Sequence, residues 1–304
     1  MQRGYQELFI DVGHGIHIAV RDYPSNGRPL VLLHGAGLNL ALWDAVADVL
    51  AHRYHLVALD FLGHGASSVP EGFTVEADLA ALERVIAELG LFRPAVIGHS
   101  YGGMLAVRYA VDHLECPIVI NIDGHGDGRA EHYAGKTPEE VGRFWTQQYE
   151  ALLAYLDGED SGSHELRETH LARMGAYAEA HGVAPETISA LAKRSIQRDR
   201  RGGWNRRPGA DLSVDMYRQL SRLDMFGLYL KVRCPVVLVL ALKPPLIPEP
   251  DADFIRAHRA GIDKAFTEMA ATMPNLRLLR TDARHLMPME RPHELCQLIV
   301  DCYP

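Results

Sequence analysis

Residues 95–104 read AVIGHSYGGM, an apolar run that leads into a glycine-rich turn around Ser100. The run predicts a buried strand at Pro94–Gly98, and the amphipathic stretch after the turn predicts a helix. A serine between a strand and a helix in this pattern sits in a strained elbow with its hydroxyl group projecting from the sheet. Gly98 and Gly102 suit the elbow because side chains there would collide where strand and helix nearly touch. The segment therefore predicts Ser100 as a catalytic nucleophile.

Strands and helices are predicted to alternate outward from this segment in both directions. Continuous apolar runs are typical of strands buried on both faces, and amphipathic stretches separate them. Two alternating runs, Glu7–Val12 and Ile16–Arg21, predict an amino-terminal hairpin. We therefore expect an α/β fold with a mostly parallel eight-stranded sheet flanked by helices. The other predicted strands are Pro29–Leu33, His55–Leu59, Pro117–Ile122, Pro235–Leu242 and Leu276–Leu279, and the predicted helices are Ala41–Ala51, Val75–Leu89, Met104–Asp112, Asp251–Met273 and Pro292–Cys302.

The alternation is interrupted once, between residues 124 and 232. This segment has no convincing buried strand, holds several short helical patterns and is rich in charged, aromatic and glycine residues. Because both of its ends join predicted sheet strands, it is an insertion and not a terminal domain. We predict a core domain made of residues 1–123 and 233–304, with residues 124–232 as a helical cap.

Composition narrows the class of protein. The 304 residues include 31 Lys and Arg against 39 Asp and Glu, a formal net charge of −8, without the basic footprint of a nucleic-acid-binding protein. The longest apolar run, Val236–Leu242, is far shorter than the about 18 residues that span a membrane. The amino-terminal stretch lacks the apolar core of a secretory signal, and four scattered cysteines suit a reducing compartment. We therefore expect a cytoplasmic protein that binds neither nucleic acid nor a membrane.

A serine hydroxyl becomes an effective nucleophile only when a base takes its proton. His285 follows the last predicted strand and precedes the last predicted helix. In strand–elbow–helix architectures the chain order is serine, acid and then histidine, so this late loop is where the base is expected. We predict His285 as the base.

The oxyanion formed by attack of such a nucleophile needs two N–H donors already in place. The amide of Tyr101, directly after the nucleophile, is predicted as one donor. The loop after Pro29–Leu33 reads HGAG at residues 34–37, and its glycines let the backbone approach a substrate closely. We predict the amide of Ala36 as the second donor and His34 and Gly35 as substrate contacts.

Together these motifs resemble the α/β-hydrolase fold family over about residues 1–123 and 233–304. The residues that carry the resemblance are HGAG at 34–37, DFLGHGAS at 60–67, GHSYGG at 98–103, and His285 followed by Pro288, Glu290 and Pro292. The resemblance implies a nucleophile–acid–base triad that works without a metal or another cofactor. It also implies that the insertion roofs the pocket and decides what fits. Serine at the elbow argues against dehalogenase or epoxide hydrolase chemistry, for which the family would use aspartate.

The triad acid departs from the usual pattern of the family. Most members carry it in the loop after the strand that corresponds to Pro235–Leu242, yet this loop opens with Lys243-Pro244-Pro245. Asp123 ends the strand after the elbow helix, a position that some members use. From there a carboxylate can reach the imidazole and fix its tautomer. We predict Asp123 as the acid, and Glu249 or Asp251 further along the loop as the alternatives.

These features predict a serine hydrolase that forms an acyl-enzyme, which water then cleaves. The expected substrate is a carboxylic ester or lactone of a small, largely apolar molecule. Hydrolysis of a thioester or of a carbon–carbon bond is an alternative, because the same triad serves both. A small-molecule receptor that keeps the triad but turns over slowly is an alternative of another class. The side chains predicted to line the cap pocket are Phe144, Trp145, Tyr149, Tyr155 and Trp204.

Basic residues gather within the predicted cap. Lys193–Pro208 contains seven basic residues and one acidic residue. A solvated face of the cap explains this pattern, and docking of an acidic partner or of an acidic substrate tail is the alternative. The histidines around His64 and His125 lack the tight spacing of metal ligands, so no metal site is predicted.

Overall fold

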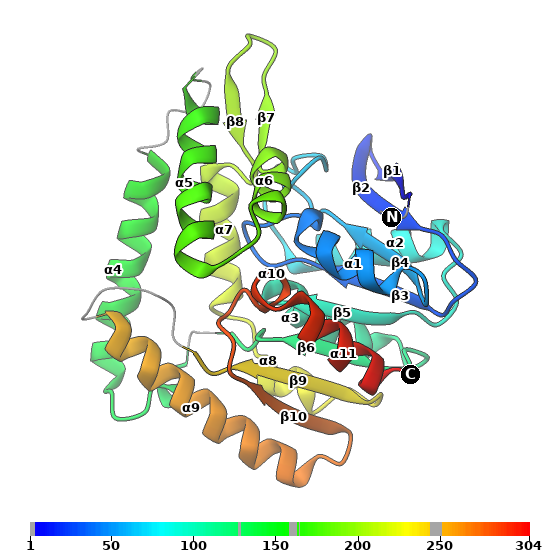
Figure 1. Ribbon diagram of the computed structural model, residues 1–304. Helices are drawn as coiled ribbons and strands as arrows, with labels where there is room; N and C mark the ends of the chain where they lie inside the picture. Colours follow the sequence, from blue (N-terminus) through cyan, green and yellow to red (C-terminus); the bar gives the residue numbers. More distant parts are fainter. Residues whose placement is uncertain (1–3, 127–128, 158–162, 164, 244–250) are drawn as a thin grey trace.

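One eight-stranded sheet forms the centre of the computed structural model, which describes residues 4–126, 129–157, 163, 165–243 and 251–304 (Figure 1). Strand pairing is antiparallel between the first three strands from the amino-terminal edge and parallel in every other pair of this sheet. The predicted fold class, a mostly parallel eight-stranded sheet, is confirmed. From edge to edge the strands are β1 (Gln6–Gly13), β2 (Ile16–Tyr23), β4 (His55–Leu59), β3 (Pro29–Leu33), β5 (Ala95–His99), β6 (Val119–Ile122), β9 (Val236–Ala241) and β10 (Leu276–Thr281).

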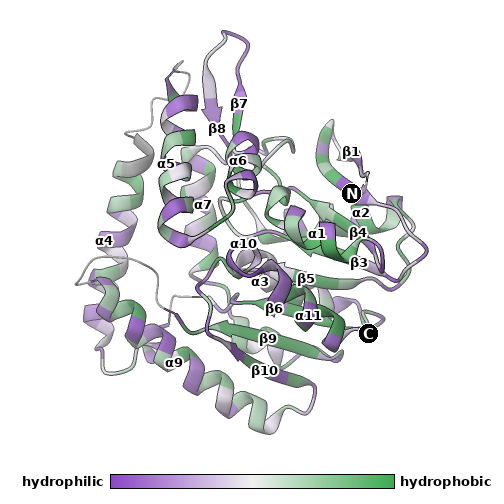
Figure 2. Ribbon diagram, in the orientation of Figure 1, coloured by the Kyte–Doolittle hydropathy of each residue, from purple (hydrophilic) through white to green (hydrophobic). Residues whose placement is uncertain are grey.

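Helices cover both faces of the sheet (Figure 1). Side chains alternate along β3, so that Val31 and Leu33 join the core on one face, and Leu30 and Leu32 join the core on the other. The inner strands β3, β4, β5, β6 and β9 are largely hydrophobic, whereas the covering helices have polar outer faces (Figure 2). The first face packs against α2 (Val75–Glu88), α3 (Tyr101–Asp112), α8 (Met225–Tyr229) and α9 (Asp251–Thr272), and the second against η1 (Leu40–Trp43), α1 (Asp44–Leu50), α10 (Met287–Glu290) and α11 (Pro292–Cys302).

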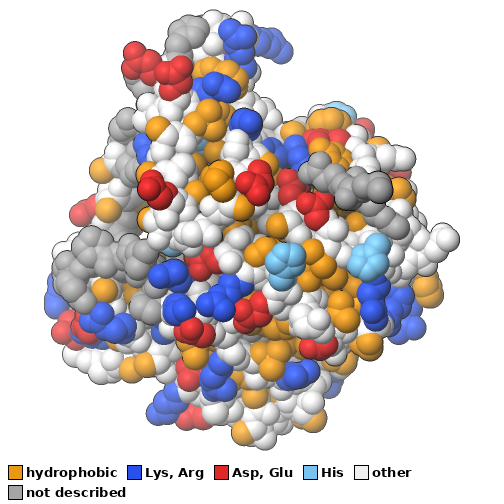
Figure 3. All heavy atoms as spheres, in the orientation of Figure 1, with side chains coloured by type: hydrophobic (Ala, Val, Ile, Leu, Met, Phe, Trp, Pro, Cys, Tyr) orange, Lys and Arg blue, Asp and Glu red, His pale blue; other side chains and the backbone are white. Residues whose placement is uncertain are grey.

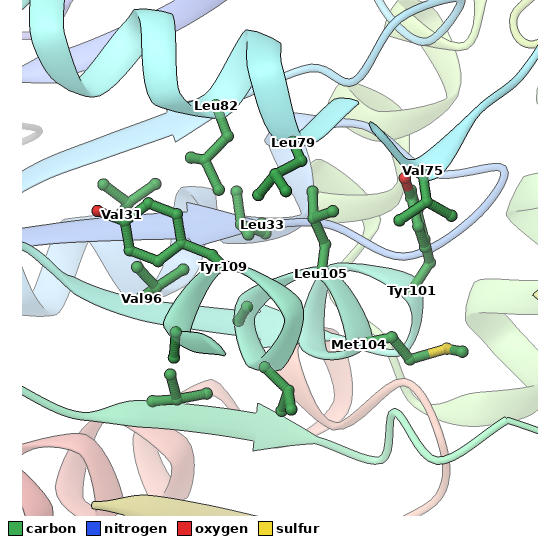
Figure 4. Packing of buried hydrophobic residues seen from close by; sticks show 14 of the residues in the cluster. Val31, Leu33, Val75, Leu79, Leu82, Val96, Tyr101, Met104, Leu105 and Tyr109 are labelled. Carbon is green, nitrogen blue, oxygen red and sulfur yellow. The ribbon is translucent and has the colours of Figure 1, made fainter. Parts of the chain in front are cut away.

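The position of α3 is fixed by packing on its buried side. Leu79 and Leu82 of α2 and Leu105 of α3 meet Leu33 of the sheet in one cluster (Figure 4). The side chains are fully or nearly fully buried, and burial of each such side chain is worth about 1.5–3 kcal/mol. The amino-terminal end of α3, which carries the elbow, is therefore held rigidly against the sheet.

The predicted cap is mainly helical, with two differences from expectation. It contains a short antiparallel hairpin, β7 (Ile196–Arg198) and β8 (Trp204–Arg206), whose three-residue strands are too short to show a readable alternation. In addition, α8 falls within residues 124–232 but packs on core helix α3, because Met225 and Tyr229 are buried in the cluster beneath it. The remaining cap elements are η2 (Ala130–His132), α4 (Pro138–Asp157), α5 (Leu166–His181), α6 (Pro185–Arg194) and α7 (Ala210–Leu220).

Figure 1 shows α4, α5 and α7 grouped on one side of the core. No helix in the described ranges is both long enough and apolar enough to cross a membrane.

Candidate active site

Ser100 occupies a strained turn between β5 and α3. Its backbone angles are φ 52° and ψ −119°, in a region that residues other than glycine rarely adopt. The close approach of strand and helix explains the flanking glycines. A Cβ atom on Gly98 would lie 2.0 Å from the carbonyl oxygen of Gly102, and one on Gly102 would lie 2.3 Å from the carbonyl oxygen of Leu33. Only glycine fits at either position, as the sequence pattern requires.

His285 and Asp123 meet although they lie 162 residues apart. Nδ1 of His285 donates a hydrogen bond of 2.7 Å to Oδ2 of Asp123. The carboxylate of Asp123 is 2% exposed and the imidazole of His285 is 41% exposed, so the acid is buried and the base is accessible from the solvent. Oδ1 of Asp123 accepts a second hydrogen bond of 2.9 Å from the amide of Ala241, the last residue of β9. In most family members the acid follows the strand that corresponds to β9. Here β9 instead donates a hydrogen bond to Asp123, the acid that follows the neighbouring strand β6.

Asn121 holds the turn that presents this carboxylate. Its Oδ1 accepts from the amide of Gly124 at 2.9 Å, and its Nδ2 donates to the carbonyl oxygen of Gly124 at 2.6 Å. Asp123 lies inside this closed loop with φ 55°, another positive angle at a residue other than glycine. The side-chain clamp thus maintains a conformation that the backbone alone disfavours.

The surroundings of Asp123 favour its ionised form. Burial alone raises the pKa of this carboxyl group, but the neighbouring rings of His125 and His285 outweigh burial and hold the pKa well below its ordinary value. Nε2 of His125 lies 3.7 Å from Oδ1, and a guanidinium nitrogen of Arg259 lies 4.0 Å from Oδ2. Asp123 is therefore a carboxylate throughout the neutral range and can stabilise a protonated His285.

His99 links the elbow to the loop that carries His285. Burial lowers the pKa of His99 to about 3, with a further contribution from the nearby His285 ring, so His99 is neutral. Its Nε2 lies 2.7 Å from the carbonyl oxygen of His285, a geometry in which Nε2–H donates. Its other ring nitrogen, Nδ1, is buried and has no hydrogen-bond partner among the described residues.

Tyr101 and Ala36 both border the space in front of Ser100. Tyr101 is the first residue of α3, so its amide has no acceptor within the helix. Its ring is anchored below, where the phenol donates a hydrogen bond of 2.7 Å to Oδ2 of Asp78 in α2. Asp78 also accepts from the amide of Leu62 at 3.0 Å. The Tyr101 amide is thereby fixed relative to two other core segments.

A cavity of about 1050 Å³ opens over Ser100 between the core and the cap. Gly35, Ser100 and His285 belong to its lining on the core side. On the cap side its lining includes Trp145 and Tyr149 of α4, two of the predicted pocket residues. Trp145 is held in place by a hydrogen bond of 2.9 Å from its indole nitrogen to the hydroxyl group of Tyr133.

Three predicted substrate contacts lie elsewhere, and these predictions are corrected. His34 is fully buried, and its Nε2 accepts a hydrogen bond from the amide of Phe61 at 3.1 Å, so it supports the loop and does not face the cavity. Phe144 is buried against Phe254 of α9, with ring centroids 4.6 Å apart. Trp204 belongs to hairpin strand β8 and is not among the cavity residues. Phe144 and Trp204 were chosen as aromatic residues of the cap and His34 as part of the HGAG loop, and neither feature distinguishes packing from substrate contact.

Of the two alternative acids, Asp251 is described and is not the partner of His285. Asp251 is the first residue of α9, whereas the described imidazole partner is Asp123. Glu249 lies outside the described residues, as does the side chain of Tyr155.

The basic residues of Lys193–Pro208 divide into two groups. Arg194 pairs with buried Asp60 at 2.8 Å and with Glu7 at 2.7 Å, and Arg207 donates to Gln197 at 2.6 Å, so these two brace the cap against the core and the hairpin. Basic side chains also gather at the tip of the β7–β8 hairpin (Figure 3). Docking of an acidic partner there remains a prediction. Within the described ranges, no three His, Cys, Asp or Glu side chains are grouped as metal ligands.

Three further residues of the site, His99, Asn121 and His125, were not predicted from the sequence. Asn121 left a signal, since it is the polar residue of an otherwise apolar strand, and a buried amide needs hydrogen-bond partners. His99 occupies a variable position of the elbow pattern, so the sequence offered no reason to single it out.

A family model described as alpha/beta hydrolase fold matches residues 28–252 of this chain. Strigolactone esterase D14 of Arabidopsis thaliana is 23% identical over 292 residues, which cover 94% of this chain and 96% of that protein. Fluoroacetate dehalogenase of a Burkholderia species is 34% identical over 129 residues, which cover 40% of this chain and 41% of that protein. This match and several others of similar identity span 28% to 42% of the relative's own length.

Among solved structures, E-2-(acetamidomethylene)succinate hydrolase has a TM-score of 0.73 with 98% of both chains covered. The identity is 20%, so this likeness concerns the fold.

Proposed function

The chain belongs to the α/β hydrolase fold family, and we propose that within this family it is a serine hydrolase acting on a carboxylic ester or lactone. The observation that carries the proposal is the hydrogen bond between His285 and Asp123 at the cavity that also exposes the elbow serine. A buried, ionised carboxylate bonded to Nδ1 leaves Nε2 of the imidazole as the proton acceptor.

In the proposed reaction, Ser100 attacks the carbonyl carbon of the substrate while His285 takes the hydroxyl proton. Asp123 fixes the tautomer of His285 and stabilises the imidazolium that forms. The amides of Tyr101 and Ala36 donate to the oxyanion as negative charge develops on the carbonyl oxygen. His285 then protonates the leaving group, and a water molecule activated by the same imidazole cleaves the acyl-enzyme.

The cavity supports a small-molecule substrate. Its volume of about 1050 Å³ suits a molecule with room on both sides of the reacting carbonyl. Trp145, Tyr149 and Leu152 supply apolar surface from the cap helix α4. We propose that the cap selects the substrate, while the loops of the sheet carry out the chemistry.

The elbow serine favours acyl transfer over dehalogenation, although one relative of the chain is named a dehalogenase. Hydrolysis of thioesters or of carbon–carbon bonds uses the same residues, and substrate comparison separates these reactions from ester hydrolysis.

Turnover of a substrate panel tests the proposal. The panel contains p-nitrophenyl acetate and butyrate, a γ-lactone and an acyl thioester, each with wild type and with Ser100→Ala. We expect steady hydrolysis of an oxygen ester or of the lactone by wild type, and a fall in kcat on the order of 10⁴ or more in the variant. Preferred cleavage of the thioester would reassign the substrate class. Stoichiometric binding without turnover would assign the chain to the receptor class.

A further inference from the structure

The cap wall of the cavity carries two arginines from one short stretch of chain. Arg218 lies in the last turn of α7, and Arg222 follows four residues later, just beyond the end of the helix. Both belong to the cavity lining, together with Tyr217, Leu220 and Ser221. This wall faces the same space as Ser100 and His285.

The charge on the cavity wall is unbalanced. Among the described lining residues, Asp123 is the sole carboxylate, and it is buried and hydrogen bonded to His285 and to the amide of Ala241. Arg218 and Arg222 are therefore not neutralised by another lining residue. A positive wall stands out in a chain with a formal net charge of −8, and it would attract an anionic group into the cavity.

Arg222 is the freer of the two guanidinium groups. Its backbone amide bonds to the carbonyl oxygen of Gln219, but its side chain makes no hydrogen bond or ion pair with any residue in the described ranges. The acidic residue closest to it in sequence, Asp224, is already paired with Arg129 at 2.6 Å and accepts from the amide of Gly227 at 3.0 Å. The local acid is therefore committed to other partners.

Arg218 makes only a weak ion pair within the protein. Its Nη1 lies 3.6 Å from Asp215 one turn earlier, and both side chains are about half exposed, so this contact is worth little. Its guanidinium carbon lies 5.2 Å from the ring centroid of Tyr149 on the facing helix α4. Contact with an aromatic face leaves the N–H edge of a guanidinium group available to an acceptor.

We propose that the cavity binds an ester or lactone that carries a free carboxylate, with Arg222 and Arg218 as the residues that bind this group. The inference rests on the proposed hydrolase function and refines its substrate class. The planar fork of N–H donors in arginine matches the two oxygens of a carboxylate. The reacting carbonyl would lie at Ser100 and the carboxylate at the cap wall, so the length of the chain between them becomes a determinant of specificity.

A matched pair of substrates tests the inference. One member is the mono-p-nitrophenyl ester of adipic acid, and the other is the p-nitrophenyl ester of its monoamide, which has nearly the same shape and no charge. The pair is assayed with wild type, Arg222→Gln, Arg218→Gln and the double variant. Arg200→Gln, on the hairpin and outside the cavity lining, is the matched control for loss of a surface charge.

We expect wild type to prefer the anionic ester by about tenfold or more in kcat/KM, as a charge-assisted hydrogen bond allows. Arg222→Gln should reduce that preference about tenfold, mainly through KM, and Arg200→Gln should retain it. Equal rates on the two esters, or an equal loss on both in the arginine variants, would overturn the inference while leaving the serine hydrolase proposal intact.

A binding measurement keeps the test independent of turnover. Ser100→Ala is titrated by calorimetry with monomethyl adipate and with its monoamide analogue. We expect the anionic ester to bind at least tenfold more tightly, and binding to weaken with added salt. No difference between the two ligands would contradict the inference even if neither ester were hydrolysed. Failure of Ser100→Ala to abolish turnover would instead contradict the proposed function.

Discussion

Nε2 of His99 lies 2.7 Å from the backbone carbonyl oxygen of His285, so the residue before the elbow serine holds the loop that carries the imidazole. The contact joins the end of β5 to the loop after β10, two segments 186 residues apart. It fixes the distance between nucleophile and base by a route that does not pass through Asp123. His99 is in this account a positioning residue.

Substitution of His99 should therefore lower kcat while leaving KM nearly the same. We expect His99→Leu, which lacks the donor, to lose about tenfold in kcat, a loss in the range of one buried hydrogen bond. His99→Gln keeps an N–H donor and should recover part of the loss. Steady-state kinetics beside thermal unfolding checks this. Equal kcat in the two variants would mean that His99 acts through packing alone.

Asp123→Asn should reduce kcat on the order of 10⁴, because an amide can neither hold the required tautomer of His285 nor stabilise its charged form. Asp251→Asn, at the start of α9, serves as the matched control and should remain close to wild type. Circular dichroism of both variants verifies folding. Near-normal turnover in Asp123→Asn would move the acid to another residue.

The cap should control which substrates fit. Trp145 lines the cavity and Trp204 does not, so the two tryptophans form a matched pair. Trp145→Ala should change KM by about tenfold across a series of acyl chain lengths, with a smaller effect on kcat for the shortest ester. Trp204→Ala should leave the series in its original order. A uniform loss of kcat in Trp145→Ala on every ester would instead give the cap a role in the chemistry.

Asp78 should make stability depend on pH. Burial raises its pKa to about 7 from an ordinary value of 3.8, although hydrogen bonds from Tyr101 and Leu62 act in the opposite direction. Between these two values the unfolded chain releases a proton that the folded chain retains. The free energy of unfolding should therefore fall as pH rises through this window and become level above it.

Asp78→Asn removes the titration and should flatten this part of the profile. Urea unfolding of wild type and variant at several pH values between about 4 and 8 measures both slopes. The same negative slope in the variant would show that another group titrates.

Most of the fold follows from local patterns in the sequence. The runs at Pro29–Leu33 and His55–Leu59 match β3 and β4 residue for residue, because strands buried on both faces are continuously apolar. The β7–β8 hairpin was missed, since three-residue strands in a basic segment have no apolar periodicity to reveal them. The placement of α8 in the core depends on tertiary packing around Tyr229, which residue type alone does not specify.

Some residues of the candidate site could likewise be predicted from local sequence patterns, and others depend on the tertiary structure. Ser100 and its glycines are encoded in one short motif, so its elbow conformation could be predicted from the sequence. The approach of Asp123, after β6, to His285, after β10, could be proposed because the parallel strands of the sheet all end at the same edge. His99, Arg218 and Arg222 reach the cavity only because the tertiary structure brings segments that are distant in the sequence together. No local pattern separates them from other polar residues.

Covalent labelling is the sharpest test of whether Ser100 is the nucleophile. The protein is treated with a fluorophosphonate and digested, and the modified peptide is identified by mass spectrometry. We expect stoichiometric modification of Ser100 in wild type, no modification of Ser100→Ala, and much slower labelling of Asp123→Asn, where His285 lacks its carboxylate partner. Labelling of a different serine, or full hydrolytic activity in protein whose Ser100 is unmodified after exhaustive treatment, would contradict this expectation.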